Sequence, residues 1–211
     1  MMTGTPLHRN TGSKEQTVIV SVVNLKGGVG KTTTALYFAE AAKEEGRTPV
    51  VIDADTERSA LEWSSQGELP FAVVASEKDA LARQARLLEK EGQVVIIDTP
   101  PNHREALWAA AAVADHVVVP VAPTGVDVNR LRGTLEVLLD IEAIKGNLDT
   151  SILFTRWDKR KRLAREAAEL LDTFPLLVSR IRSLTRYEDG FGSRPWYLTE
   201  YRQAWSEVVS G

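Results

Sequence analysis

The chain has 211 residues, of which 43% are hydrophobic, 26% charged and 7% aromatic. This composition is that of an ordinary globular protein and excludes disordered, collagen-like and low-complexity chains. Cysteine is absent, which excludes disulfides, thiol nucleophiles, thiolate zinc sites and iron–sulfur ligation, so any metal chemistry must use oxygen ligands. Residues 1–16 contain no apolar core of signal-peptide length, and no later stretch reaches the ~18 apolar residues of a membrane span, so we expect a cytoplasmic protein.

The net charge of −3 does not by itself indicate a nucleic-acid-binding protein, but the charge is unevenly distributed. Residues 1–155 carry 15 Lys and Arg against 21 Asp and Glu, whereas residues 156–211 carry 11 against 8. The basic excess in the second part is compatible both with a solvated helix face and with a polyanion-binding patch.

Residues 1–16 are polar and lack periodicity, so we expect a flexible tail followed by a single domain over residues 17–211. After the tail, β-branched runs typical of strands buried on both faces alternate with segments of helical spacing. The expected strands are 17–24, 48–55, 71–75, 93–100, 115–123 and 150–156, of which 71–75 has the weakest pattern. The expected helices are 31–45, 57–66, 77–91, 104–114, 128–144 and 159–171.

This alternation predicts an α/β fold with a mostly parallel twisted sheet and helices on both faces. Gly46, Gly92 and Gly146 follow three of the helical segments, where a left-handed C-cap favours glycine. In such sheets ligands bind outside the carboxyl ends of the strands. Functional residues are therefore sought where the expected strands end.

The first expected strand runs directly into residues 26–33, with the sequence KGGVGKTT. Gly30, Lys31 and Thr32 match the end of a phosphate-binding loop, although Leu25 stands where the general pattern has its first glycine. Glycines allow backbone N–H groups to surround phosphate oxygens, the helix N-terminus adds its positive dipole, and the lysine adds an ammonium group. A threonine hydroxyl at this position can bind Mg²⁺. The loop predicts a P-loop NTPase fold.

The string KGGVGKTT, with its additional lysine Lys26, resembles the deviant Walker A loop of the ParA/MinD family of P-loop ATPases. This resemblance implies ATP and Mg²⁺ as cofactors, hydrolysis of ATP to ADP and phosphate, and a nucleotide-dependent sandwich homodimer. Lys26 would be the catalytic lysine that reaches the partner's nucleotide, and Lys31 the catalytic lysine that holds phosphates in its own subunit. The nucleotide-binding residues that the resemblance implies are Lys26, Gly27, Gly28, Val29, Gly30, Lys31, Thr32 and Thr33.

Carboxylates end two further strands. Asp53 and Asp55 follow one apolar run, and Asp98 follows another in the manner of a Walker B carboxylate that holds Mg²⁺ through water. The family resemblance implies that Asp55 positions or activates the attacking water, and that Asp53 lies nearer the Mg²⁺ shell. An N-cap role for Asp55 at the following helix is compatible with this role. The expected metal-binding residues are Thr32, Asp53 and Asp98.

The residues that follow Asp55 and Asp98 bear on the loops at this site. Thr56 and Glu57 stand where the ParA/MinD family usually has Pro-Gln, which is a departure in the loop that follows Asp55. After Asp98, residues 99–101 (Thr-Pro-Pro) would form the stiff start of a switch loop that senses the γ-phosphate.

The resemblance extends from Thr17 to the C-terminus, and residues 53–67, 115–127 and 153–171 are similar to segments of the small plasmid-partition ParA proteins. Only the polar tail precedes the first strand, so we expect the short ParA type without an operator-reading helix-turn-helix. The three histidines, His8, His103 and His116, have no ligand or triad spacing and are expected to be structural or surface residues.

A basic segment follows the last expected strand. Between Arg156 and Arg186 there are nine basic and four acidic residues, and Leu163, Leu170 and Leu171 are expected to face the body of the protein. The resemblance implies that this region binds DNA without sequence preference when ATP holds the dimer, so that two weak patches act together. The candidate DNA-binding residues are Arg160, Arg162, Arg180, Arg182 and Arg186.

These features favour a ParA-type partitioning or positioning ATPase, associated with the nucleoid in its ATP-bound form and released by a ParB-like or adaptor protein that stimulates hydrolysis. The cargo stays open between a plasmid, a chromosome origin and a protein assembly. One alternative is a biosynthetic P-loop enzyme related to the dethiobiotin synthetase or cobyric-acid groups, against which the basic segment argues. The other is a MinD-like membrane-positioning ATPase. The C-terminal apolar stripe at residues 197–209 has too few basic residues for a membrane-binding helix, so we expect it to pack on the protein.

Overall fold

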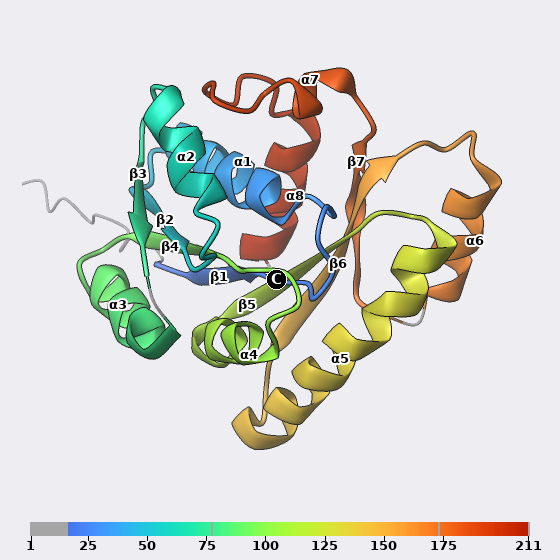
Figure 1. The fold of residues 1–211 in the computed structure, drawn as a ribbon, viewed down its shortest axis with the longest axis horizontal. Helices are drawn as coiled ribbons and strands as arrows, with labels where there is room; N and C mark the ends of the chain where they lie inside the picture. Colours follow the sequence, from blue (N-terminus) through green and yellow to red (C-terminus); the bar gives the residue numbers. More distant parts are fainter. Residues whose placement is uncertain (1–16, 77, 173, 211) are drawn as a thin grey trace, which may run out of the picture.

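The computed structural model describes residues 17–76, 78–172 and 174–210. Seven strands form one parallel sheet in the order β3-β2-β4-β1-β5-β6-β7 (Figure 1). The strands are β1 (Ile19–Val22), β2 (Pro49–Asp53), β3 (Ala72–Ala75), β4 (Val94–Asp98), β5 (His116–Val121), β6 (Asp149–Trp157) and β7 (Leu176–Arg182). The helices are α1 (Lys31–Glu44), α2 (Ser59–Gln66), α3 (Lys78–Lys90), α4 (Arg104–Val113), α5 (Gly125–Lys145), α6 (Arg162–Leu170), α7 (Thr185–Glu188) and α8 (Thr199–Ser210). The predicted α/β architecture is confirmed. The tail expected at residues 1–16 lies outside the described residues.

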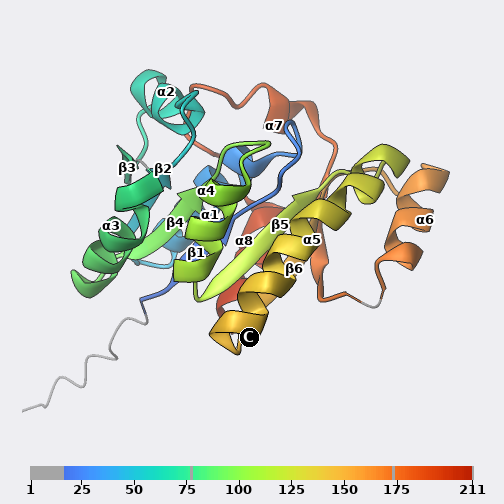
Figure 2. The same cartoon turned by 60° about the horizontal axis from the view of Figure 1, so that its bottom comes forward.

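Two hydrophobic cores lie on opposite faces of the sheet. Ile19 of β1 and Ile97 of β4 belong to the core under α3, α4, α5 and α6, whereas Val20 and Ile96 belong to the core under α1, α2 and α8. Neighbouring residues point to opposite faces because side chains alternate along a strand. Figures 1 and 2 show the two helical layers on either side of the sheet. Strands covered on both faces explain the nearly continuous apolar runs in the sequence.

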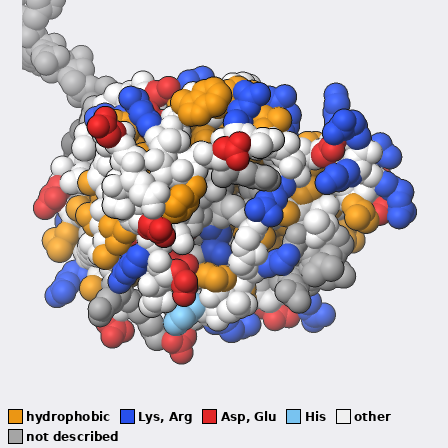
Figure 3. Space-filling view, turned by 45° about the horizontal axis from the view of Figure 1, so that its top comes forward, with side chains coloured by type: hydrophobic (Ala, Val, Ile, Leu, Met, Phe, Trp, Pro, Cys, Tyr) orange, Lys and Arg blue, Asp and Glu red, His pale blue; other side chains and the backbone are white. Residues whose placement is uncertain are grey.

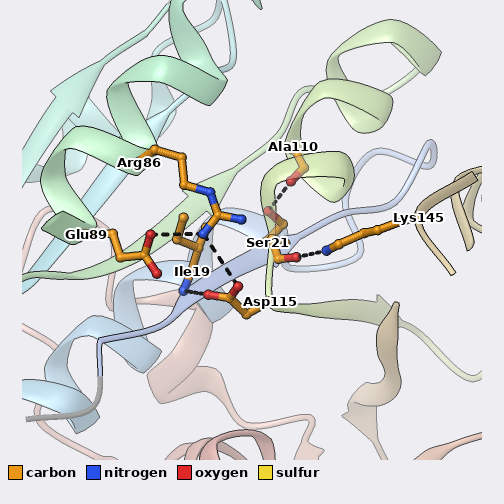
Figure 4. A network of polar contacts seen from close by, with 8 residues as sticks. Ile19, Ser21, Arg86, Glu89, Ala110, Asp115 and Lys145 are labelled. Atoms are coloured by element: carbon orange, nitrogen blue, oxygen red, sulfur yellow. Dashed lines mark hydrogen bonds and ion pairs between the residues drawn. The ribbon is translucent and has the colours of Figure 1, made fainter. Parts of the chain in front are cut away.

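Polar contacts hold the beginning of β1 in place (Figure 4). The Ile19 N–H donates to the Asp115 carboxylate at 2.8 Å, and the Arg86 guanidinium lies 3.6 Å from the same carboxylate. Deeper in the strand, the Ser21 hydroxyl donates to the Ala110 carbonyl oxygen at 2.8 Å. These contacts tie the central strand to α3 and α4, which leaves its opposite, carboxyl end to carry the loop that leads into α1.

Three helices begin two or three residues away from the expected position, while the bounds of the other three expected helices differ by at most one residue at either end. The helix α2 begins at Ser59 instead of residue 57, and α5 begins at Gly125 instead of residue 128. The helix α6 begins only at Arg162, because Asp158 accepts the Arg160 N–H with its carboxylate and the Lys161 N–H with its carbonyl oxygen, each at 3.0 Å. These bonds hold the residues before α6 in a turn.

Strand β7 was not expected from the sequence, and it forms an edge of the sheet. The Val178 N–H donates to Glu207 Oε2 at 2.5 Å, and the Ser179 N–H donates to Glu207 Oε1 at 2.9 Å. A carboxylate from α8 thus occupies backbone donors that an edge strand otherwise leaves open.

The C-terminal stripe packs on the protein, as predicted. Tyr201, Trp205 and Val208 of α8 are buried against α1 and the sheet, and the Trp205 indole N–H donates to the Glu45 carboxylate at 3.0 Å. The predicted left-handed glycines after helices are also confirmed, with φ of 84° at Gly46 and 88° at Gly92. Within the described residues, no helix is both long enough and apolar enough to cross a membrane.

Candidate functional site: a phosphate loop at the carboxyl edge of the sheet

The loop between β1 and α1 has the backbone that its glycines predict. Gly28 and Gly30 adopt φ of 74° and 87°, a region that side-chain-bearing residues rarely occupy. Helix α1 begins directly after Gly30, so its N-terminus points into the loop. The Lys31 ammonium is almost fully buried and donates to the Lys26 carbonyl oxygen at 3.0 Å. Burial lowers the pKa of Lys31, and the Asp98 and Asp55 carboxylates oppose this shift.

Side chains from distant elements brace this loop from below. The Thr134 hydroxyl of α5 accepts the Leu25 N–H at 3.1 Å and donates to Asn24 Oδ1 at 3.3 Å. Asn24 Oδ1 in turn accepts the Lys26 N–H at 2.8 Å. From β6, the Thr155 hydroxyl donates to the Val29 carbonyl oxygen at 2.8 Å. The loop conformation therefore depends on residues more than one hundred positions away.

Replacing Thr134 with valine tests this brace. Valine has the same shape but no hydroxyl, so the half-buried Leu25 N–H loses its acceptor at a cost of about 1 kcal/mol. We expect Tm to fall by roughly 2–4 °C per kcal/mol and nucleotide to bind more weakly, measured by thermal unfolding with and without nucleotide. Thr150→Val is the control, because its hydroxyl makes only a 3.4 Å contact at the far end of β6. Equal effects of both variants would contradict the brace.

A hollow of about 410 Å³ lies above the phosphate loop. Of the residues predicted to act in the site, those that line it are Gly27, Gly28, Gly30, Lys31, Thr32, Thr33 and Asp55, together with Thr99 and Pro101 of the expected switch loop. Val29, Asp53 and Asp98 are instead buried beneath this surface, and Lys26 is partly buried and is not among the lining residues. The structure thus gives the two lysines of the motif different positions relative to the hollow.

Asp53 and Asp55 have different surroundings. Asp53 is fully buried, and its carboxylate accepts the Asp55 N–H and the Leu61 N–H, each at 3.0 Å. Burial raises the pKa of Asp53, and these two bonds oppose the shift. Asp55 Oδ1 accepts the Glu57 N–H at 3.0 Å. The interpretation of Asp55 as the N-cap is wrong, because α2 begins at Ser59 after Arg58 and it is Asp53 that reaches the first turn. The Asp53 carboxylate therefore fixes the backbone between β2 and α2 in this structure.

Asp98 is one of four side chains among the described residues with a buried polar atom that lacks a hydrogen-bond partner, and it lies at the end of β4. It lies beside Asp53 in the paired register of β2 and β4, and neither carboxylate oxygen has a partner in hydrogen-bonding geometry among the described residues. Burial raises the pKa of Asp98 to about 7, while the nearby Thr32 hydroxyl and Lys31 ammonium oppose the shift. A buried carboxylate without partners beside a hydroxyl is a donor set that suits a hydrated Mg²⁺.

The described residues contain no group of three or more carboxylate or imidazole side chains placed to hold a metal ion. A Mg²⁺ ion at Thr32 and Asp98 would therefore complete its octahedral shell with phosphate oxygens and water, as this ion commonly does. The residues present fit such a site, with Asp98 acting through water.

Sequence reasoning missed four residues that line the hollow, which are Ser59, Trp63, Arg156 and Phe191. Arg156 follows Thr155 at the end of β6 and adopts φ of 50°, one of three positive φ values at non-glycine residues in the described chain. Trp63 of α2 and Phe191 of the α7–α8 connection form another part of its wall. Arg156 could have been found by the rule that pointed to Asp53 and Asp98, since it also ends a strand. Nothing local in the sequence marks Trp63 or Phe191.

The predicted DNA-binding arginines all have partners inside the molecule. Arg180 is half-buried, with its guanidinium 5.2 Å from the Phe154 ring centre and donating to backbone carbonyls of β7, so little of its charge is available at the surface. Arg182 pairs with Glu200, and Arg186 lies 4.1 Å from the Tyr197 ring centre. The other two make exposed ion pairs, Arg160 with Asp158 and Arg162 with Glu166.

The leucines of the basic segment differ from expectation. Leu171 is buried, as predicted, but Leu163 and Leu170 are 47% and 62% exposed. Their prediction was wrong because α6 contacts the body through its small residues Ala164 and Ala167. Among the histidines, His103 accepts the Ala106 N–H at the start of α4, and His116 lies 3.0 Å from the Ser151 hydroxyl. Both are structural, whereas His8 lies outside the described residues.

The sequence matches the CobQ/CobB/MinD/ParA nucleotide-binding domain over residues 20–187, which is most of the chain. The chain belongs to this family. The family contains the ParA and MinD ATPases, so the resemblance seen in the phosphate loop is confirmed, and the P-loop NTPase fold with it.

Two known relatives each match about two thirds of this chain. "Maintenance of carboxysome distribution protein A" of Gloeobacter kilaueensis is 33% identical over 67% of this chain and 64% of its own length. "Protein ParA" of Rhizobium radiobacter is 27% identical over 65% of this chain and 64% of its own length. The chain thus spans less than two thirds of these relatives. The solved structure of apo McdA from Cyanothece has a TM-score of 0.76 at 18% identity, covering 92% of this chain and 100% of that one, which shows the shared fold.

Proposed function

We propose that this protein is an ATP- and Mg²⁺-dependent positioning ATPase of the ParA type. Two copies associate as a sandwich dimer when ATP is bound, the dimer binds DNA without sequence preference, and hydrolysis stimulated by an adaptor protein releases it. The observation that carries the proposal is the different position of the two lysines in the phosphate loop. Lys31 lines the hollow of its own subunit, whereas Lys26 is not among the residues that line it. Relatives named for carboxysome distribution and as ParA support a positioning role and leave the cargo open.

Each residue of the site has a role in this proposal. The loop N–H groups and the Lys31 ammonium hold phosphates, and Asp55 orients the attacking water from the wall of the hollow. Thr32, with Asp98 acting through water, holds Mg²⁺, which supplies charge neutralisation at the phosphates. Lys26 reaches the nucleotide of the partner subunit, where its charge acts as an arginine finger does.

The DNA-binding surface in this proposal centres on the turn before α6 and on α6 itself. Lys159, Lys161 and Arg165 are exposed there. Arg160 and Arg162 belong to the same surface, because exposed ion pairs contribute little and a DNA phosphate can replace the carboxylate. Figure 3 supports this location, since Lys and Arg side chains gather on the side of the molecule where Figure 1 places α6.

Retention of a random-sequence DNA duplex tests the function. We expect the protein with Mg²⁺ and ATP to bind the duplex, binding to weaken steeply as salt rises, and the protein with ADP to bind little, because one patch alone is weak. Absence of binding in both nucleotide states, with ATP bound in solution, would remove DNA from the proposal.

Charge-reversal variants locate the surface. Changing Lys159, Lys161 and Arg165 together to Glu should weaken DNA binding at least about tenfold and reduce its salt dependence. The control changes Lys43, Arg83 and Lys90 to Glu, since these are equally exposed and lie on α1 and α3. Equal losses in both triple variants would indicate a net-charge effect and would contradict an α6 surface.

A further inference from the structure

Trp63 stands between two hollows. The hollow over the phosphate loop and an adjoining one of about 390 Å³ share five lining residues, which are Gly30, Thr33, Trp63, Arg156 and Phe191. The second hollow continues to Tyr187 and Tyr201 in the C-terminal part of the chain. Trp63 is only 3% exposed, so its ring is a fixed part of the wall that both hollows share.

The beginning of α2 is attached to the two aspartates at the end of β2. The Leu61 N–H donates to the Asp53 carboxylate, and the Glu57 N–H donates to the Asp55 carboxylate. Arg58, with φ of 56°, donates to the Asp53 carbonyl oxygen at 2.7 Å and to the Ser76 carbonyl oxygen at 3.2 Å. The position of Asp55 is therefore coupled to the position of α2, a helix of eight residues.

The middle and end of α2 dock on the connection between α7 and α8. The Trp63 indole N–H donates to the Ser193 carbonyl oxygen at 2.7 Å, across 130 positions of sequence. The rings of Trp63 and Phe191 lie 5.3 Å apart. The indole is thus both a donor and a packing surface for this connection.

Two glycines allow the docking. A Cβ atom at Gly67 would lie 3.1 Å from the Gly192 carbonyl oxygen, and one at Gly192, where φ is 75°, would lie 2.8 Å from the Gln66 side-chain oxygen. At Gly67 the neighbouring backbone of Gly192 leaves little room for a Cβ atom, and at Gly192 the positive φ itself favours glycine. The contact is therefore a specific fit between α2 and residues 190–194.

The same connection continues to the α1 helix and to an exposed aromatic surface. Arg194 makes two hydrogen bonds to Glu40 of α1, a carboxylate that is 1% exposed. Beyond it, Trp196 is 67% exposed, and the Arg186 guanidinium lies 5.9 Å from its ring centre. Residues 190–194 thus contact α1 through Arg194 and α2 through Ser193, and they lead to the exposed Trp196.

We propose that Trp63 is a positioning residue that joins α2 to residues 190–194, so that nucleotide at the phosphate loop sets the Asp55 segment and this connection together. The proposal rests on the proposed function, because it requires ATP at the phosphate loop. Trp63 acts through α2: its bond to Ser193 fixes the helix, the Leu61 N–H of the helix orients Asp53, and the Glu57 N–H of the turn that leads into the helix orients Asp55. The consequence is that hydrolysis and the state of the C-terminal connection depend on the same indole group.

Trp63→Phe tests the proposal, because it keeps an aromatic wall and removes the indole donor. With Mg²⁺ and ATP, we expect the ATP dissociation constant to stay within about threefold of wild type and single-turnover hydrolysis to fall about tenfold, as expected for one lost positioning bond. Amide hydrogen exchange supplies the second readout. In the wild type, residues 190–196 should exchange more slowly with ATP than without nucleotide, and in the variant this difference should disappear.

A second variant and a control accompany the measurement. Phe191→Leu removes the aromatic ring that packs on Trp63. Because Phe191 is partly exposed, the change should not unfold the chain, but it should reduce the ATP-dependent slowing of exchange at residues 190–196. Trp108→Phe makes the same chemical change in α4, on a tryptophan that lines neither hollow, and should behave as wild type.

The outcomes separate the two proposals. If the wild type does not bind ATP, the proposed function fails and the role of Trp63 with it. If ATP binds but Trp63→Phe hydrolyses ATP and protects residues 190–196 as wild type does, only the role of Trp63 is overturned. A large loss of ATP affinity with unchanged turnover would also overturn it, because Trp63 would then contact the nucleotide directly.

Discussion

Lys26→Ala is expected to abolish ATP-dependent dimerisation and to remove most ATP turnover, while ATP still binds the monomer. The reason is the position of Lys26, whose side chain is not among those lining the hollow of its own subunit. When a partner protein supplies a cation to the phosphoryl group that is being transferred, the hydrolysis rate of comparable NTPases rises by a factor of about 10³–10⁵. Dimerisation would be measured by sedimentation with Mg²⁺ and ATP, and turnover by phosphate release.

The matched comparison for this variant is Lys31→Ala. Lys31 lines the hollow and lies at the first position of α1, so its loss should weaken nucleotide binding itself. Lys43→Ala, an exposed change in the last turn of the same helix, should have no effect. Full turnover and dimerisation of Lys26→Ala would contradict a lysine that acts across the interface.

Asp55→Ala is expected to trap the ATP-bound dimer. Asp55 is 9% exposed, lines the hollow and is oriented by the bond from the Glu57 N–H, and in the proposed function its carboxylate orients the attacking water. Loss of a positioned general base costs about 10²–10⁴ in rate. Single-turnover hydrolysis should fall in this range, and the dimer formed with Mg²⁺ and ATP should persist in size-exclusion chromatography.

Glu57→Ala serves as the control for Asp55. Glu57 also lines the hollow, but its side chain is exposed, and it lies two residues further from the end of β2 than Asp55 does. It should hydrolyse ATP within about threefold of wild type, well short of the loss expected for a positioned base. Normal turnover in Asp55→Ala, or equal losses in both variants, would refute the role of Asp55.

The strands that the sequence predicted are the interior ones and β3, and the one it missed is β7. Interior parallel strands are covered on both faces, so each reads as a continuous apolar run that can be recognised locally. Strand β7 instead contains Ser179, Arg180 and Arg182 and lies at the edge of the sheet. Its Val178 and Ser179 amides are satisfied by Glu207 of α8, a contact that no local pattern announces.

The basic segment shows the same limit for side chains. Charge counting located the basic excess, but it could not tell that the Arg180 guanidinium lies against the rings of Phe154 and Trp157. Aromatic and carbonyl partners of an arginine come from the fold, and they decide whether its charge is available at the surface.

The sequence by itself determined the phosphate loop and the sheet that carries it. The loop is one contiguous run from strand through glycines to helix, so its chemistry follows from neighbouring residues and from the conformations that glycine permits. Only the tertiary structure decided what surrounds the loop. The unpartnered Asp98 beneath Thr32, the Thr134 and Thr155 braces, and the Trp63 contact with Ser193 join residues that are distant in the chain. Such contacts depend on how strands and helices are ordered in space, which no short segment encodes.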